Sequence, residues 1–384
     1  MTTVIDADQH LFEARELWAE RSPARDRDDC VRIVDDDLGF GWVTWRGRRI
    51  YPAEVFRPGD VDGTGAGRAA NRAGERADVN YDDAPADYHD PDARIARLDA
   101  LGLDAAVLFP NAGLVWERAV ERDLHALTTN MAAWNSWAID VAQQGRGRLH
   151  PVAHVTLRDL DWLAAQLRAL DAGGVRLAML GPALVDGKPL HHPDLDRAWA
   201  SFVEHGITPV FHVSNFDRPF AEPWYEGDFD PVDPVLQTAF IWVPAALALA
   251  DLAIHGVLAR HPDLRIGVME LSASWAAHFL PSLDGTFDFH RRQNGQPLTE
   301  LDEPPSAYIR RQARIAAFAY ERPDLLRERA GDIFMACSDY PHGEGTATPL
   351  EDYRAMCPRA GAPADDPAFF GGNVAFLLRA DTSR

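Results

Sequence analysis

The stretch DPDARIARLDALGLDAAVLFP at residues 90–110 predicts a helix that leads directly into a strand. Asp90 is a good N-cap residue, Pro91 suits the first helical position, and Gly102 ends the helical pattern. The apolar run at 104–109 then predicts a short buried strand. A helix followed at once by an apolar strand is the repeating unit of folds built on a parallel sheet.

Seven further β-type runs lie on either side of this unit, and most are separated by amphipathic segments such as 160–170 and 245–260. The runs are Thr3–Asp8, His150–Val155, Gly174–Leu180, Thr208–Val213, Arg265–Leu271, Arg314–Ala317 and Ile333–Ser338. Eight strands alternating with helices predict an α/β chain folded as a closed (β/α)8 TIM barrel. An open doubly wound sheet is the competing fold, but no G-x-G-x-x-G motif follows an early strand.

Two segments interrupt the repeat. Residues 22–90, after the first strand, contain a hairpin-like stretch at 31–51 and a Gly-, Asp- and Arg-rich flexible loop at 58–83. Residues 215–237, after the fifth strand, gather aromatic side chains and are expected to form a lid. Both insertions would lie over the carboxyl-terminal face of the barrel, where barrel active sites occur. No change of composition marks a second domain, so we predict a single barrel domain over residues 1–384.

The chain has 38 Lys and Arg against 59 Asp and Glu, a net charge of −21. Such a surface repels nucleic acid and anionic membranes, so we expect neither as a partner. The N-terminus has no signal-peptide pattern. Cys30, Cys337 and Cys357 lie too far apart in the sequence for a CxxC motif. We therefore expect a cytoplasmic protein without disulfides.

Polar residues stand at the ends of three strand candidates. Asp8 and His10 are two residues apart, which places both side chains on one face of the first strand. His212 closes the fifth strand and Asp339 closes the eighth. Two imidazoles with one or two carboxylates suit one divalent ion, such as zinc, manganese or iron, and leave room for water or substrate. Each residue also has a structural alternative: a cap or turn for the acids, and a hydrogen-bonded core histidine for the imidazoles.

Seven stretches resemble the amidohydrolase superfamily, within it the amidohydrolase-related, aminocarboxymuconate-semialdehyde-decarboxylase-like branch. They are VIDADQHLFE (4–13), DPDARIARLDALGLDAAVLFP (90–110), GRLHPVAHVTLRDLD (147–161), ITPVFHVSN (207–215), HPDLRIGVMELSASW (261–275), CSDYPHGEG (337–345) and GGNVAFLL (371–378). They cover essentially the whole chain in order. The resemblance implies a distorted (β/α)8 barrel with one divalent metal, zinc most often. It also implies either hydrolysis of C–N or C–O bonds or decarboxylation of aromatic or enol acids, without an organic cofactor.

The resemblance also implies roles for individual residues. Asp8 and His10 match the first-strand metal motif in its acidic variant. His212 matches the fifth-strand ligand, and Asp339 matches the eighth-strand ligand and proton shuttle. The fourth strand has no lysine to carry a carbamate bridge, which favours a single metal. Glu270 ends the sixth strand where many members have a histidine; it is either a general base, a partner of an arginine, or a residue that holds the ring of His212.

Four further residues are weaker candidates for contact with the substrate. His342 either lines the pocket or orders its own loop. Asn111, after the second strand, and Asn215, after the fifth, either donate hydrogen bonds to the substrate or form turns. Trp224, in the second insertion, is expected to cover the substrate.

We therefore expect a metal-dependent hydrolase of a small organic substrate, such as an amide or a lactone, with Asp339, Glu270 and His212 as its catalytic residues. The first alternative is a non-oxidative, metal-dependent decarboxylase of an aromatic or enol acid. The second is a barrel without catalysis that serves as a binding subunit, although the intact polar residues argue against it. A homodimer is a further expectation, since the family often pairs barrels and the insertions offer apolar surface.

Overall fold

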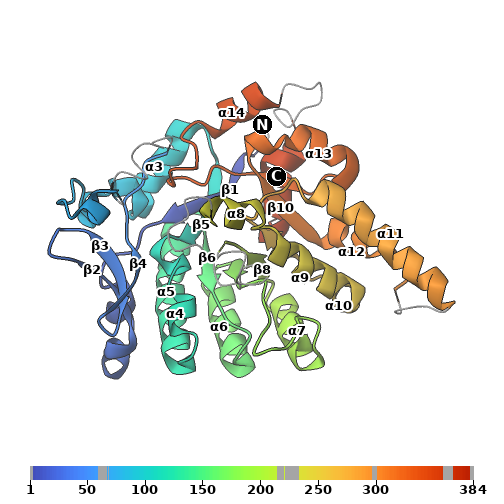
Figure 1. Cartoon of the computed structure of the whole chain (residues 1–384), viewed down its shortest axis with the longest axis horizontal. Helices are drawn as coiled ribbons and strands as arrows, with labels where there is room; N and C mark the ends of the chain where they lie inside the picture. Colours follow the sequence, from blue (N-terminus) through green and yellow to red (C-terminus); the bar gives the residue numbers. More distant parts are fainter. Residues whose placement is uncertain are drawn as a thin grey trace.

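A parallel sheet of eight strands forms the centre of the protein (Figure 1). The structure, a computed structural model, describes residues 3–58, 67, 69–213, 220, 233–295, 301–357 and 366–380. In sheet order the strands are β1 (Ile5–Leu11), β5 (Ala105–Pro110), β6 (Leu149–His154), β7 (Leu177–Met179), β8 (Thr208–Phe211), β9 (Ile266–Val268), β10 (Ala313–Ala317) and β11 (Phe334–Ala336). All eight predicted strands are present, although several of their ends differ.

The first and last strands close the sheet into a barrel. Gln9 and Tyr340 form a parallel bridge between the two edges. The backbone N–H of Asp339 donates to the carbonyl of Asp8 over 2.8 Å, and that of His10 donates to the carbonyl of Tyr340 over 2.7 Å. The predicted α/β class and TIM-barrel fold are thus confirmed.

Strand β1 contains a bulge around Asp8, the first residue of the predicted metal motif. Its register with β5 shifts between Asp6 and Gln9. The buried Asp6 carboxylate accepts hydrogen bonds from Asp8 N at 3.2 Å, from Gln9 Nε2 at 2.9 Å and from Ser338 N at 2.9 Å. A bulge redirects side chains near a functional site. The strand continues to Leu11, so the predicted end at Asp8 was too early.

Helices cover the outside of the sheet, and the first of the large ones begins and ends as predicted. The carboxylate of Asp90 accepts a hydrogen bond from Ala93 N at 2.8 Å, and Gly102 ends the helix in the left-handed conformation at φ 70°. The α-helices are α1 (Leu17–Glu20), α3 (Pro91–Leu101), α4 (Glu117–Val120), α5 (Leu124–Gln144), α6 (Leu160–Ala172), α7 (Asp196–Glu204), α8 (Asp233–Ala239), α9 (Val243–Ile254), α10 (Val257–Arg260), α11 (Ala276–Asn294), α12 (Pro305–Gln312), α13 (Pro323–Ala330), α14 (Pro349–Met356) and α15 (Asn373–Leu378). Within the described ranges, no helix has the length and apolar character needed to cross a membrane.

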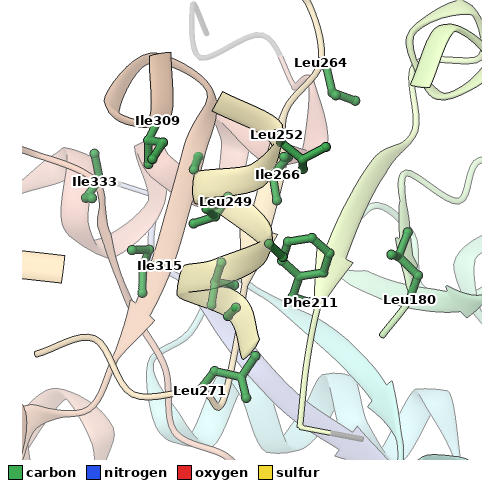
Figure 2. Packing of buried hydrophobic residues seen from close by; sticks show 14 of the residues in the cluster. Leu180, Phe211, Leu249, Leu252, Leu264, Ile266, Leu271, Ile309, Ile315 and Ile333 are labelled. Atoms are coloured by element: carbon green, nitrogen blue, oxygen red, sulfur yellow. The ribbon is translucent and has the colours of Figure 1, made fainter. Parts of the chain in front are cut away.

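Apolar side chains between the sheet and the helices make the largest core. Leu249 and Leu252 of α9 lie over Ile266 of β9 and Ile315 of β10, all of them buried (Figure 2). Burial of each such side chain contributes about 1.5–3 kcal/mol. A second cluster of buried apolar side chains fills the interior of the barrel, and it includes Leu377 of α15. The barrel is therefore a packed scaffold for the polar side chains at its carboxyl-terminal mouth.

The first insertion carries an antiparallel sheet of three strands, one more than the predicted hairpin. Its strands are β2 (Val31–Asp35), β3 (Gly41–Trp45) and β4 (Arg48–Pro52). This sheet stands beside the barrel, on the left in Figure 1. Val31 and Val43 join Leu127 and Met131 of α5 in one buried cluster, which anchors the insertion to the barrel. Most of the predicted lid at 215–237 lies outside the described residues.

Candidate active site

Polar side chains from four strands converge at the carboxyl-terminal mouth of the barrel. Asp8 and His10 belong to β1, and His212 directly follows β8. Glu270 follows β9, and Asp339 follows β11. The side chains of all five are fully buried except that of Glu270, which is 15% exposed. The structure thus brings together every residue that the sequence proposed as a metal ligand or a catalytic group.

The two imidazoles face the three carboxylates at close range. His10 Nε2 lies 3.0 Å from Asp339 Oδ1 and 3.5 Å from Asp8 Oδ1. His212 Nε2 lies 3.4 Å from Asp8 Oδ1 and 3.3 Å from Glu270 Oε2. These separations are those of atoms that share one small cation, whose bonds to nitrogen and oxygen are about 2.0–2.2 Å long.

The other nitrogen of each imidazole fixes the tautomer. His10 Nδ1 lies 3.0 Å from the carbonyl oxygen of Pro110, and His212 Nδ1 lies 3.1 Å from that of Val213. A carbonyl only accepts, so each Nδ1 carries the hydrogen and donates it. Each Nε2 then presents a lone pair to the cluster, which is the arrangement of a metal-binding histidine.

Several atoms of this cluster have no hydrogen-bond partner among the residues that the structure describes. They are both carboxylate oxygens of Asp8, His10 Nε2, His212 Nε2, Glu270 Oε2 and Asp339 Oδ2. Buried polar atoms are almost always paired, because each unpaired one costs about 1–3 kcal/mol and a charge costs more. With its carboxylates ionised, the donor set offers lone pairs and negative charge, so it fits a divalent cation.

Burial and mutual repulsion act on the carboxylates in different ways. Burial raises the pKa of Asp8 well above its ordinary value, and the charge of Asp339 raises it further. Burial also raises the pKa of Glu270, again with a contribution from Asp339. Burial alone would raise the pKa of Asp339, but His342 and His10 outweigh it and hold that pKa below the usual range. Asp339 is therefore the carboxylate that stays charged without a cation.

The imidazoles of the cluster are neutral at pH 7. Burial lowers the pKa of His10 to about 3, with a further contribution from His342. Burial lowers the pKa of His212 as well. A neutral imidazole is the form that binds a metal.

His342 links the cluster to Asn111. Its Nδ1 lies 2.9 Å from Asp339 Oδ1, and its Nε2 donates to Asn111 Oδ1 over 3.0 Å. The ring also stacks on that of His10 with the ring centres 3.9 Å apart. Burial lowers the pKa of His342, but Asp339 outweighs burial and raises it. The structure places His342 and Asn111 beside the cluster with their polar atoms bonded to each other, and contact with a substrate stays a prediction.

The backbone is strained where it carries the candidate catalytic carboxylates. Glu270 and Asp339 have φ angles of 50° and 55°, in the left-handed region that favours glycine. Each such residue costs on the order of 1–3 kcal/mol, and such strain is concentrated at functional sites. The chain also packs tightly after Asp339: a Cβ at Gly345 would lie 2.5 Å from the carbonyl oxygen of that residue.

Sequence reasoning missed the buried Arg94, which supports the metal motif from α3. Its guanidinium donates to Gln9 Oε1 over 3.1 Å and to the carbonyl of His10 over 2.7 Å. Arg94 lies on the inner face of an amphipathic helix, where its position could have marked it as an unusual buried charge.

Glu13 is a second missed residue, although it lies in a motif that the resemblance covered. Its fully buried carboxylate accepts hydrogen bonds from Ala112 N at 2.9 Å and from Gly113 N at 2.8 Å. Burial raises its pKa to about 7. Glu13 therefore fixes the loop that follows Asn111, on the side of the site where His342 lies.

The first insertion reaches the site through one aromatic ring. Phe56 meets the ring of His342 edge-on, with the ring centres 5.4 Å apart. Phe56 also lines a cavity of about 430 Å³ between the three-stranded sheet and residues 69–81. Apolar and aromatic side chains that line this cavity are Phe40, Trp42, Val55, Phe56, Val79 and Tyr81. The predicted contacts Asn215 and Trp224 lie outside the described residues.

A separate group of metal-type side chains lies away from the mouth. His191 Nδ1 is 2.6 Å from Asp251 Oδ1, and His191 N donates to Asp251 Oδ2 over 2.9 Å. The ring of His255 stacks on that of His191. Since the carboxylate already binds two N–H groups of one loop, we interpret this group as a tie between that loop and α9.

Comparison with known proteins identifies the fold. No family model matches the chain, and no curated protein matches it. An amidohydrolase from Mycobacterium avium subsp. paratuberculosis superimposes with a TM-score of 0.78 and 23% identity, over 98% of this chain and 99% of that one. A 5-carboxyvanillate decarboxylase from Novosphingobium aromaticivorans was solved with bound manganese and 3-methoxy-4-hydroxy-5-nitrobenzoic acid. It superimposes with a TM-score of 0.64 and 18% identity, over 98% of this chain and 97% of that one. A 2,6-dihydroxybenzoate decarboxylase complexed with 2,6-dihydroxybenzoate superimposes with a TM-score of 0.62 and 16% identity, over 99% of each chain.

At these identities the likeness establishes the shared barrel. One of the proteins that share it is named an amidohydrolase and the other two are named decarboxylases. These are the two activities that the sequence resemblance indicated. The fold alone does not choose between these two chemistries.

Proposed function

We propose that this chain is a metal-dependent hydrolase of the amidohydrolase superfamily that cleaves a C–N or C–O bond in a small organic substrate, such as an amide or a lactone. One observation carries the proposal: two neutral imidazoles aim their lone pairs at three buried carboxylates, each with at least one oxygen that has no hydrogen-bond partner in the described part of the chain. A packed barrel has no structural use for such a set, which costs several kcal/mol unless a cation binds it.

Asp8, His10, His212 and Asp339 would hold one divalent ion, with Glu270 beside it. When bound, such an ion supplies Lewis acidity that polarises a carbonyl group and makes water a stronger acid. Zinc is our first expectation from the resemblance. The three carboxylates also suit manganese or iron, since oxygen ligands favour those ions, and one protein with this fold contains manganese.

The residues of the chain divide the proton transfers between them. Asp339, which stays ionised, accepts a proton from the attacking water at its free Oδ2. Glu270 shares the role of base from the opposite side of the set, where its carboxylate orients that water by accepting its second proton in a hydrogen bond. As the water oxygen bonds to the carbonyl carbon and the C–N or C–O bond breaks, Asp339 returns the proton to the departing nitrogen or oxygen. Water is consumed, and an acid with an amine or alcohol is released.

Decarboxylation is the second candidate, and the names of two proteins with this fold favour it. In that reaction a buried carboxylic acid would protonate the ring carbon that loses carbon dioxide. Glu270 is our candidate for such an acid, since burial raises its pKa and so favours the protonated form. The binding-subunit alternative gains no support, because a non-catalytic barrel needs no unpaired carboxylates.

A substrate panel separates these candidates. The protein, loaded with zinc or manganese, is incubated with N-acyl amino acids and lactones, and in parallel with 2,6-dihydroxybenzoate and 5-carboxyvanillate. Acid release is followed with a pH indicator, and carbon dioxide is measured directly. Turnover of an amide or lactone without carbon dioxide supports the hydrolase, whereas carbon dioxide from a hydroxybenzoate would replace it with the decarboxylase. A small-molecule substrate, a homodimer and a cytoplasmic location remain our predictions alongside this function.

A further inference from the structure

A carboxylate outside the metal-binding set holds the loop that carries Glu270. Glu321 ends the 3₁₀ turn Ala319–Glu321 after β10. Its Oε1 accepts hydrogen bonds from Ser272 Oγ at 2.6 Å, from Ala273 N at 2.7 Å and from Ser274 N at 3.1 Å. A single side chain thus joins the loop after β9 to the turn after β10.

The second oxygen of Glu321 is also engaged. Its Oε2 accepts a hydrogen bond from Phe318 N at 3.1 Å, within its own turn. Both oxygens are therefore occupied by neutral donors, and the side chain is fixed in one orientation. A carboxylate that accepts several N–H and O–H groups forms strong, charge-assisted bonds.

The loop that Glu321 holds is strained. Glu270 and Ser272 both have left-handed φ angles, of 50° and 56°, with the buried Leu271 between them. Two such residues in three positions persist only when their surroundings fix them. Trp275 Nε1 also donates to the carbonyl of Ser272 over 2.9 Å, which adds to the bonds of Glu321.

We propose that Glu321 is a positioning residue that keeps the carboxylate of Glu270 against the metal-binding set; the inference rests on the proposed function, because it takes that set to bind a metal. Oε2 of Glu270 lies 3.3 Å from His212 Nε2 and has no hydrogen bond of its own to hold it there. Its location is therefore set by its backbone, and the backbone is set by the bonds to Glu321.

The test measures manganese affinity of the full-length chain by the electron paramagnetic resonance signal of free Mn²⁺. The variants are Glu321→Ala, Glu321→Gln, Glu270→Gln and the double variant Glu321→Ala/Glu270→Gln, with Glu351→Gln on the surface of α14 as a control. The negative charge of Glu270 beside the ion contributes to its binding, and loss of a residue that orients such a group weakens metal binding by about 10- to 100-fold. We expect about a 10-fold loss for Glu321→Ala and for Glu270→Gln, a smaller loss for Glu321→Gln, which keeps one acceptor oxygen, and none for the control.

The double variant distinguishes positioning from general support of the fold. If Glu321 acts through Glu270, the double variant binds no more weakly than Glu270→Gln alone, whereas independent effects would multiply. Wild-type affinity in Glu321→Ala, or multiplied losses in the double variant, would overturn the inference and leave the proposed function intact. A wild-type chain that binds no Mn²⁺ would overturn both. If Glu321→Ala does not fold, the same comparison is made with Glu321→Gln.

Discussion

Nε2 of His212 lies 3.3 Å from Oε2 of Glu270, and neither atom makes a hydrogen bond within the described part of the chain. The two residues follow β8 and β9, which are neighbours in the sheet. His212 turns its lone pair to Glu270 because its Nδ1–H is bound to the carbonyl of Val213. A lone pair that faces a buried carboxylate is stable only with a proton or a cation between them.

Replacement of His212 by alanine should remove most of the bound metal, because it deletes one of two nitrogen ligands and leaves a gap in the set. Metal content after loading and desalting, measured by mass spectrometry, is expected to fall from about one ion per chain to less than about 0.2. His290→Ala, at an exposed position on α11, is the control and should keep its metal. Normal metal content in His212→Ala would refute the ligand assignment.

The Glu270→Gln variant should still bind a metal ion at saturating metal concentration, but its kcat should be lower than that of the wild type. The amide has nearly the same shape as the carboxylate, but it neither accepts nor delivers a proton. Loss of a general acid or base costs about 10²- to 10⁴-fold, so kcat should fall in that range on whichever substrate the panel identifies. Glu351→Gln, exposed on α14, is the matched control. A variant with wild-type kcat would remove Glu270 from the mechanism.

The stability of the chain should depend on pH through Glu13. Burial raises the pKa of Glu13 from 4.5 to about 7, so between these values the folded chain holds a proton that the unfolded chain releases. The stabilisation is complete below pH 4.5 and is lost as pH rises through 7. At about 1.4 kcal/mol per unit, the loss amounts to about 3 kcal/mol.

Urea unfolding of wild type and Glu13→Gln at pH 4.5 and pH 8 measures this effect. Glutamine does not titrate, so the free energy of unfolding of wild type relative to the variant should fall by about 3 kcal/mol between the two pH values. If the free energies of unfolding of wild type and Glu13→Gln differ by the same amount at pH 4.5 and pH 8, Glu13 keeps an ordinary pKa in the folded chain.

Arg94→Met should destabilise the chain by about 2–4 kcal/mol, because it leaves Gln9 Oε1 and the carbonyls of His10 and Asp87 without their buried donor. Arg97→Met on the same helix is the matched control. Arg97 is 40% exposed and lies 3.4 Å from Asp87, so its loss should cost less than about 1 kcal/mol. Equal free energies of unfolding for the two variants would contradict the role of Arg94.

Much of the fold was predictable because its signals are local. The cap at Asp90, the stop at Gly102 and the apolar runs of the strands are written in neighbouring residues. The bulge in β1 was not predictable, because the Asp6 carboxylate at the bulge accepts a hydrogen bond from Ser338 N, at the opposite end of the sequence. The third strand of the insertion was also missed, since Arg48–Pro52 has no clear alternation of apolar and polar residues.

The sequence allowed prediction of those site residues that stand at the end of a recognisable strand. Asp8, His10, His212 and Asp339 each stand at the end of an apolar run, and barrel geometry brings such positions together. Glu321, Arg94 and Glu13 had no such signal, since each acts through hydrogen bonds to residues distant in the sequence. Their roles exist only once the barrel has closed.

The metal content of the wild-type chain decides whether the residues at the barrel mouth form a metal site. The protein is stripped with a chelator, desalted, loaded separately with Zn²⁺ and Mn²⁺, and desalted again before analysis of metal and protein. We predict one ion per chain and a higher melting temperature for the loaded protein, because the ion binds only the folded set of Asp8, His10, His212 and Asp339. A folded chain that stays empty with both ions, and melts at the same temperature, would contradict the account.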